Sequence, residues 1–493
     1  MAVTLDVGFE TVGNATLICH DRGPVLVTDP WISGSAYFGS WGRSHEIPAE
    51  QMDAIHRCKF VWLSHGHPDH LSSESLHVLR TKTILLPDHV GGRIFTSLKE
   101  QGYDVHILKD RVWTDLSDRI KIMCIADYFQ DAILLVDLNG RLLVNKNDAN
   151  DRGWKRFVKR IIKQYHVSFL LSLSGFGDAD MINFLDEGGT RILPYAARKY
   201  PVGRAIAAET EDFGTLFFVP FSSFHKYQRK DSVWAEEYRT TLADYPRGYY
   251  LQSRAILPAF IRYDCLSDAV AEIGPPETPA VLLDPEHFDD KWAEPLEASD
   301  VTEIRKYFKS FAHLAKYLDF VNVRVGGKDN VVELGSAQFK RGITFAAPRH
   351  SLMLAVRHEI FDDLLIGNFM KTTLHGKWTL DKLYPDFTPF VAKYGDNGRA
   401  KSDEELAQYF EAYKRRAPID FVRHELESRS KHIIRGCIPY ESGAYRLGRR
   451  MYWSLKTSWR SGVRPQTGVL LSRADDGMQS QTLARNGDPL GGE

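Results

Sequence analysis

The sequence lacks an excess of charge of either sign, and it lacks long apolar runs. Its 493 residues contain 63 Lys and Arg against 64 Asp and Glu, so the charge gives no reason to expect a nucleic-acid partner. No window approaches the roughly 18 consecutive apolar residues of a membrane-spanning helix. Residues 1–6 carry no basic signal region. We therefore expect a soluble, cytoplasmic protein without a transmembrane segment.

Cysteine is also scarce. The five cysteines are odd in number and widely spaced: Cys19, Cys58, Cys124, Cys265 and Cys437. A chain of this length can bury a large core without disulfide bonds. Free thiols in a reducing compartment are the expected state.

By contrast, side chains that bind metals are dense between residues 63 and 72. Three histidines and one aspartate fall within six positions: His65, His67, Asp69 and His70. The preceding apolar run, 60–63, predicts a buried strand that ends in a loop bearing these ligands. Ser72 and Ser73 can cap a helix that begins behind the loop.

This spacing predicts a dinuclear metal site. His65 and His67 can reach one ion, while Asp69 and His70 can supply a carboxylate and an imidazole to a second. Two divalent ions about 3.5–4 Å apart can hold an oxygen ligand between them. A lone histidine is more often structural, but four ligand-type residues at this spacing are not easily explained that way.

The first half of the chain alternates between strand and helix patterns. Strands are predicted at 132–138 and 167–173, and Asn139-Gly140 indicates a hairpin turn after the first of them. Strands that end in polar residues and are separated by helices predict an α/β sandwich whose polar residues gather at one edge. Asp29 follows one strand, where it would either orient a ligand histidine or cap the turn before Pro30.

The His-x-His-x-Asp-His motif at 65–70 resembles that of the metallo-β-lactamase superfamily, and the likeness extends over residues 1–240. The resemblance implies an αββα sandwich, which is an α/β fold, with Asp69 and Asp148 as catalytic residues. By order along the chain, Asp148 matches the family's bridging aspartate and His225 looks like its last ligand. The alternatives are a turn residue beside Asn147 and a loop histidine.

One ligand of the family's pattern is missing. The usual third histidine falls just before the hairpin strand, and residues 125–131 contain no histidine. Asp127 is the candidate substitute, and Asp131, Gln130 or an empty position are the alternatives. A carboxylate in place of an imidazole suits iron better than zinc, although ligand type alone does not fix the metal.

In this respect the site resembles the di-iron β-hydroxylase branch of the superfamily. The runs 13–16, 29–31 and 147–148 further resemble the metallo-β-lactamase part of the CMP-N-acetylneuraminate hydroxylases. Those enzymes also carry a Rieske module, whose Cys-x-His and Cys-x-x-His pairs do not occur in this sequence. Electrons for oxygenase chemistry would then have to come from elsewhere, for which a separate electron-donor protein is the expected partner.

After residue 240 the pattern loosens, and we expect an α+β accessory domain over 241–470. One helix is predicted at 351–365. The basic aromatic stretch 446–464 could bind phosphate, an acidic partner or a membrane surface, or it could be an ordinary basic helix. The polar, glycine-containing composition of 471–493 predicts a disordered tail.

The leading functional hypothesis is an oxygen-dependent di-iron hydroxylase, a monooxygenase acting on a small or carrier-linked substrate. In it, His65, His67 and an acidic residue hold one iron, Asp69, His70 and His225 hold the other, and Asp148 bridges. The alternative is a zinc hydrolase that cleaves an ester, amide or phosphodiester. A metal-binding module without catalysis is a third hypothesis, in which Asp69 would have little structural purpose.

Overall fold

The computed structural model describes residues 5–150, 153–173, 175, 181–198, 201–335, 341–378 and 382–426. All of them belong to one compact unit, residues 1–427. The predicted basic stretch at 446–464 and the predicted tail at 471–493 lie outside the described residues, as does Cys437. The other four cysteines are free and buried, as expected: Cys19, Cys58, Cys124 and Cys265.

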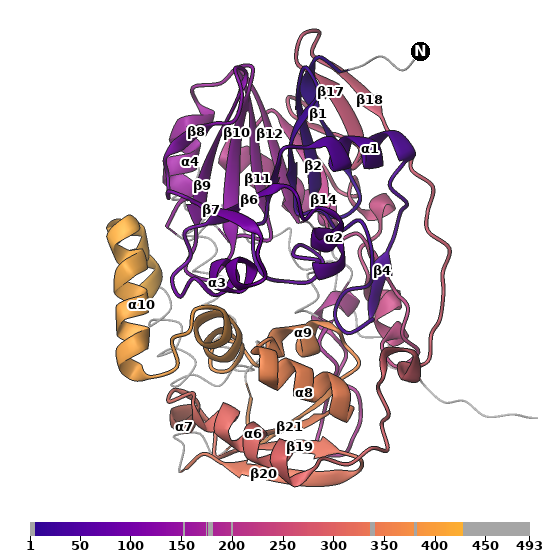
Figure 1. Cartoon of the computed structure of the whole chain (residues 1–493), viewed down its shortest axis with the longest axis vertical. Coiled ribbons are helices and arrows are strands. Elements are labelled where there is room, and N and C mark those ends of the chain that lie inside the picture. Colours follow the sequence, from indigo (N-terminus) through magenta and orange to yellow (C-terminus); the bar gives the residue numbers. More distant parts are fainter. Residues whose placement is uncertain are drawn as a thin grey trace, which may run out of the picture. The chain divides into compact units, whose positions relative to one another are not determined.

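Two sheets pack face to face around a shared apolar interior, which includes Phe9 and Trp62 from one sheet and Phe169 from the other (Figure 1). The first sheet has the strand order β18-β17-β1-β2-β3-β5-β6-β7, and the second β16-β14-β12-β11-β10-β9-β8. The first comprises β18 (Ala269–Glu272), β17 (Ile261–Asp264), β1 (Val7–Val12), β2 (Thr16–Asp21), β3 (Pro24–Thr28), β5 (Phe60–Trp62), β6 (Thr83–Pro87) and β7 (Asp104–Leu108). The second comprises β16 (Ala255–Ile256), β14 (Phe217–Ser222), β12 (Val167–Leu173), β11 (Arg141–Asn147), β10 (Ala132–Leu138), β9 (Ile120–Ala126) and β8 (Trp113–Asp115).

Helices cover the outer faces of both sheets. Ile55 and Leu76 pack helices α1 and α2 on the first sheet, and Leu98 packs α3 there too. Val158 and Ile206 pack α4 and α5 on the second. These helices are α1 (Ala49–Arg57), α2 (Ser73–Val78), α3 (Arg93–Glu100), α4 (Lys155–Ile162) and α5 (Val202–Phe213). The four layers form an αββα sandwich, which confirms the predicted α/β fold.

A third sheet, of order β13-β22-β21-β19-β20, has a core of its own. It comprises β13 (Phe184–Leu185), β22 (Lys371–His375), β21 (Gly342–Ala346), β19 (Phe320–Val325) and β20 (Lys328–Glu333). The remaining helices are α6 (Ala298–Lys309), α7 (Leu314–Tyr317), α8 (Arg349–His358), α9 (Phe361–Ile366), α10 (Asp403–Arg416) and the π-helical η6 (Pro389–Asn397). Short 3-10 turns are η2 (Tyr195–Arg198), η3 (Val233–Tyr238), η4 (Leu242–Asp244) and η5 (Pro285–Phe288), and β4 (Trp41–Arg43) pairs with β15 (His225–Tyr227).

Segments before and after residue 240 contribute strands to both the sandwich and the third sheet. Strands β17 and β18 follow that residue yet extend the first sheet, whereas β13 precedes it and joins the third. The domain boundaries expected at 240 and 470 stay predictions. None of the helices within the described ranges combines the length and apolar character that a membrane crossing requires.

The prediction of a single helix over residues 351–365 is wrong. The structure has two helices there, α8 and α9, because Glu359 between them adopts a left-handed conformation with a φ of 55°. A residue in this conformation ends an α-helix. The interruption gives α9 a start of its own at Phe361, one residue before Asp362.

Candidate metal centre

The residues that follow β3, β5 and β11 meet at one edge of the sandwich. Asp29 follows β3, the 63–72 loop follows β5, and Asp148 follows β11. At the end of the loop, the Ser72 hydroxyl accepts a hydrogen bond from the Ser75 amide and caps α2, as predicted. A strand and a capped helix thus hold the loop at both ends.

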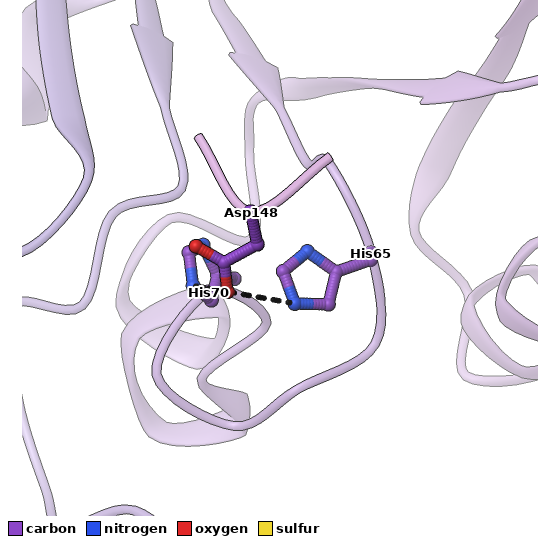
Figure 2. A group of neighbouring side chains, drawn as sticks. All are labelled: His65, His70 and Asp148. Carbon is purple, nitrogen blue, oxygen red and sulfur yellow. Dashed lines mark ion pairs between the residues drawn. The ribbon is translucent and has the colours of Figure 1, made fainter. Parts of the chain in front are cut away.

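Asp148 faces two of the loop histidines (Figure 2). Its Oδ2 lies 3.9 Å from Nε2 of His65 and 3.6 Å from Nε2 of His70. The ligand atoms of these three residues all lie within 4.8 Å of one another. They are the group of ligand-type side chains among the described residues whose spacing suits one metal ion.

Each loop histidine is anchored through its outer ring nitrogen. The Nδ1 of His65 lies 2.9 Å from the Ser64 hydroxyl, which in turn donates to Asp29. The Nδ1 of His70 lies 3.2 Å from Asp29 Oδ2. The Nε2 of His67 lies 3.0 Å from Asp362 Oδ2. A proton on each outer nitrogen would leave the lone pair of the inner nitrogen for a metal, which is the arrangement of metal-binding histidines.

Asp69 is also held from two sides. Its Oδ1 accepts a 2.6 Å hydrogen bond from the Tyr37 hydroxyl, and its Oδ2 accepts one of 3.0 Å from the Asn14 amide. Burial alone would raise the pKa of Asp69, but His70, His67 and Tyr37 outweigh it and lower the pKa. The carboxylate is therefore ionised and fixed 3.3 Å from the His70 Nε2.

His225 lies on β15, and Asp69 is one of the charges that act on it. Its ring is buried and stacks on Trp41 with centroids 3.5 Å apart. Burial lowers the pKa of His225 and Arg239 lowers it further, while Asp69 raises it. The structure thus brings His225 into the field of Asp69, and its role as a ligand stays a prediction.

The two aspartates before β10 have different surroundings. Asp127 Oδ1 accepts hydrogen bonds from the backbone amides of Phe129 and Asp131, which is a turn-capping role. Asp131 is buried, and its Oδ1 lies 3.9 Å from Nζ of Lys393. Burial raises the pKa of Asp131, Lys393 and His67 lower it, and Asp148 raises it again. Asp131 therefore shares its electrostatic surroundings with the histidine loop.

The donor set fits a divalent transition metal. Imidazole nitrogens and carboxylate oxygens converge. The buried Nε2 of His70 makes no hydrogen bond among the described residues, but carboxylate oxygens of Asp69 and Asp148 lie 3.3 and 3.6 Å from it. Burial lowers the pKa of His70, but Asp69 and Asp29 outweigh it and raise the pKa. Since a metal competes with a proton for the same lone pair, carboxylates that attract the proton also attract the cation.

Sequence patterns did not reveal Asp362 and Lys393. Both are buried and contact His67, yet they lie about 300 positions away along the chain, with His67 and Asp362 separated by 295. No local motif marks either residue. Their charged character within otherwise apolar segments was the one available signal, because buried charges are rarely left without partners.

Comparisons with known proteins give partial likenesses. No family model matches the chain. The cytidine monophosphate-N-acetylneuraminic acid hydroxylase of Danio rerio is 30% identical over 133 residues, 25% of this chain and 22% of the relative. That of Sus scrofa is 26% identical over 190 residues, 35% of this chain and 44% of the relative. The chain thus spans less than half the length of these curated relatives.

Among solved structures, CmlA, a diiron β-hydroxylase from Streptomyces venezuelae, is 14% identical with a TM-score of 0.30, covering 44% of this chain and 45% of that one. The metallo hydrolase Igni18 from Ignicoccus hospitalis is 12% identical with a TM-score of 0.30, covering 54% and 99%. The donor set is that of a candidate metal site. The chain folds as an αββα sandwich, and over part of its length it resembles the CMP-N-acetylneuraminic acid hydroxylases.

Proposed function

We propose that this chain is an oxygen-dependent di-iron hydroxylase. The observation that carries the proposal is a carboxylate where the family's third histidine would stand. Asp131 supports this assignment better than Asp127, because it faces Lys393 and the histidine loop while Asp127 caps its own turn. A site richer in carboxylate favours iron over zinc. The curated relatives, named as hydroxylases, support the same reaction class.

In the proposed centre, His65, His67 and Asp131 would hold one metal ion. Asp69, His70 and His225 would hold the second, and Asp148, which faces both His65 and His70, would be available to both ions. When bound, iron supplies the redox chemistry that dioxygen activation requires. The burial of Asp69, His65 and His70 keeps bulk water away from the reacting groups.

The proposed reaction is a hydroxylation of a small substrate. A C–H bond becomes C–OH, the second oxygen atom of dioxygen leaves as water, and the balance requires two electrons and two protons. A separate electron-donor protein would supply the electrons. The chain itself fixes the ligands, through Tyr37 and Asn14 on Asp69 and through Asp29 on His70.

Metal analysis tests this proposal. Protein purified without added metal should contain iron, close to two equivalents per chain, and the chemically reduced protein should consume oxygen. Zinc in both sites, together with no oxygen uptake by iron-reconstituted protein, would overturn the proposal.

The intact His-x-His-x-Asp-His motif equally supports a zinc hydrolase as the second candidate. In that case the zinc-loaded protein should hydrolyse p-nitrophenyl acetate or bis(p-nitrophenyl) phosphate, and Asp69→Ala should abolish the activity. An exposed carboxylate such as Glu100 offers the control, since Glu100→Gln lies away from the centre. No hydrolysis by the zinc form would count against this candidate.

A further inference from the structure

Two side chains from the second half of the chain reach the histidine loop. Asp362, on α9, lies with Oδ2 3.0 Å from His67 Nε2. Lys393, on η6, places Nζ 3.5 Å from the same nitrogen and 3.5 Å from Asp362 Oδ2. All three side chains are buried, so water does not weaken these interactions. His67 Nε2 is therefore shared between an acceptor and a donor.

Asp362 and Lys393 make opposite demands on the proton of His67. An ionised carboxylate only accepts, so a hydrogen bond to Asp362 requires the proton on Nε2. An ammonium group only donates, so a hydrogen bond from Lys393 requires the proton on Nδ1 instead. The two partners thus select different tautomers of one imidazole.

Only one of these tautomers can bind a metal at the candidate centre. His67 Nδ1 lies 2.9 Å from Nε2 of His65, so Nδ1 is the nitrogen that faces the other ligands. A proton on Nδ1 would occupy the lone pair that a metal needs. The shorter contact, from His67 Nε2 to Asp362, corresponds to the tautomer that leaves Nδ1 free.

We propose that Asp362 is a positioning residue that fixes the metal-binding tautomer of His67. Lys393 is its counter-ion, and its charge is divided between Asp362 and Asp131, whose Oδ1 lies 3.9 Å from Nζ. The two carboxylates thus compete with His67 for the hydrogen-bond donors of the ammonium group. The second half of the chain therefore completes the metal centre from outside the ligand loop. The inference rests on the metal centre of the proposed function, but not on the reaction performed there.

Cobalt titration of the metal-free full-length chain tests the role of Asp362. The d–d absorption of bound Co²⁺ reports its coordination, and calorimetry gives the affinity of each equivalent. Asp362→Ala should weaken one of the two equivalents by about 10- to 100-fold, the usual effect of losing such a partner. Asp362→Asn, whose amide oxygen still accepts, should weaken it less.

Asp363→Asn is the matched control. Asp363 is the next residue on α9 and lines the same cleft, but it makes no hydrogen bond to His67 within the described residues. This variant should bind both equivalents as the wild type does. Melting of each metal-free variant separates a folding defect from a binding defect, and Asp362→Asn carries the test if Asp362→Ala does not fold.

A double variant tests the tautomer directly. Without Asp362, Lys393 should donate to His67 and place the proton on Nδ1, so Asp362→Ala combined with Lys393→Met should regain part of the lost cobalt affinity. Wild-type affinity in Asp362→Ala, or a double variant that binds no better than Asp362→Ala, would overturn the inference. A wild-type chain that binds no cobalt would overturn the metal centre itself.

Discussion

At the scale of single residues, Asp29 holds together segments that are distant along the chain. Its Oδ1 accepts from the Ser64 amide, and its Oδ2 accepts from the Ser64 hydroxyl and from Asn147. The same Oδ2 lies 3.2 Å from His70 Nδ1. One buried carboxylate thus fixes the ends of β5 and β11 and the orientation of the His70 ring.

Asp29→Asn should lower the metal affinity about 10- to 100-fold, because an amide nitrogen in place of Oδ2 would face donors only. Asp21→Asn is the control: Asp21 is also buried, but its partners are Arg119 and Arg22. The control should lose stability and keep its metal affinity. Isothermal titration with Zn²⁺ checks both variants, and an Asp29→Asn chain with wild-type affinity would contradict the assigned role.

The sequence predicts the candidate site residues that lie close together in a motif. It does not predict those that tertiary packing brings to the site from distant segments. The four ligand-type residues of the loop were predicted from spacing, and the structure shows the expected contact of Asp29 with a histidine. The choice between Asp127 and Asp131 depends on the path of a short turn, which spacing does not determine. Asp362 could not be predicted, because its partner lies 295 positions away.

At the scale of elements, the start of α3 lies against the end of η6. Gly91 has a φ of +89°, and a Cβ there would lie 2.4 Å from the carbonyl oxygen of Gly398. Gly92 also has a positive φ, +55°, but a Cβ there would meet nothing within 4 Å. Both glycines therefore need a positive φ, but only at Gly91 would a Cβ collide with the backbone of Gly398.

Gly92→Ala should cost about 1–2 kcal/mol, the price of a left-handed backbone for alanine. Gly91→Ala should cost about 1–3 kcal/mol more, because the added methyl group forces the Gly398 backbone away. Thermal unfolding of the metal-free proteins measures the difference. Equal losses in the two variants would show that this contact contributes nothing to stability.

The break between α8 and α9 shows why element boundaries were harder to predict than strands. The strands at 132–138 and 167–173 were predicted with the observed bounds, since apolar runs flanked by turn residues mark them clearly. The helix predicted at 351–365 has apolar residues throughout, and Glu359 carries no signal for a left-handed conformation. That break is nevertheless what gives Asp362 its place near the start of α9.

At the scale of the whole described unit, Glu10 on β1 links two other strands of the first sheet and the helix α1 that covers it. Its carboxylate lies 2.9 Å from His20 on β2 and accepts 2.8 Å hydrogen bonds from Gln51 on α1 and Arg262 on β17. Burial opposes its ionisation, but His20, Gln51 and Arg262 outweigh burial and lower the pKa of Glu10 from 4.5 to about 2. The folded chain therefore favours the carboxylate more strongly than the unfolded chain does.

This difference predicts a pH dependence of stability. The contribution of Glu10 is fully present above pH 4.5, its unfolded value, and is lost as the pH falls towards about 2. Glu10→Gln should thus lower the free energy of unfolding at pH 7 by on the order of 3 kcal/mol. At pH 3 the difference in free energy of unfolding between wild type and Glu10→Gln should be smaller. Urea unfolding of metal-free protein at both pH values measures this. A difference in free energy of unfolding that stays constant with pH would contradict the role given to Glu10. Glu100→Gln, at an exposed position, is the control and should unfold with the same free energy as the wild type.

The sequence predicts those parts of the architecture whose strands and helices have a clear hydrophobic pattern of their own. Alternating strands and helices specified the sandwich, whereas β13 and β17 join sheets that their sequence positions do not suggest. Such pairings depend on contacts between distant segments, which one sequence does not display. The same long-range packing brings Asp362 and Lys393 to His67 in the histidine loop.

The stoichiometry of bound metal tests the central claim, a dinuclear centre built on the 63–72 loop, most directly. Wild-type chain and His70→Ala would be stripped, reconstituted with metal, passed through gel filtration and analysed by mass spectrometry. A dinuclear centre should give two equivalents per chain for the wild type and no more than one for His70→Ala. A wild-type chain that retains no metal, or a His70→Ala chain that retains as much as the wild type, would contradict it.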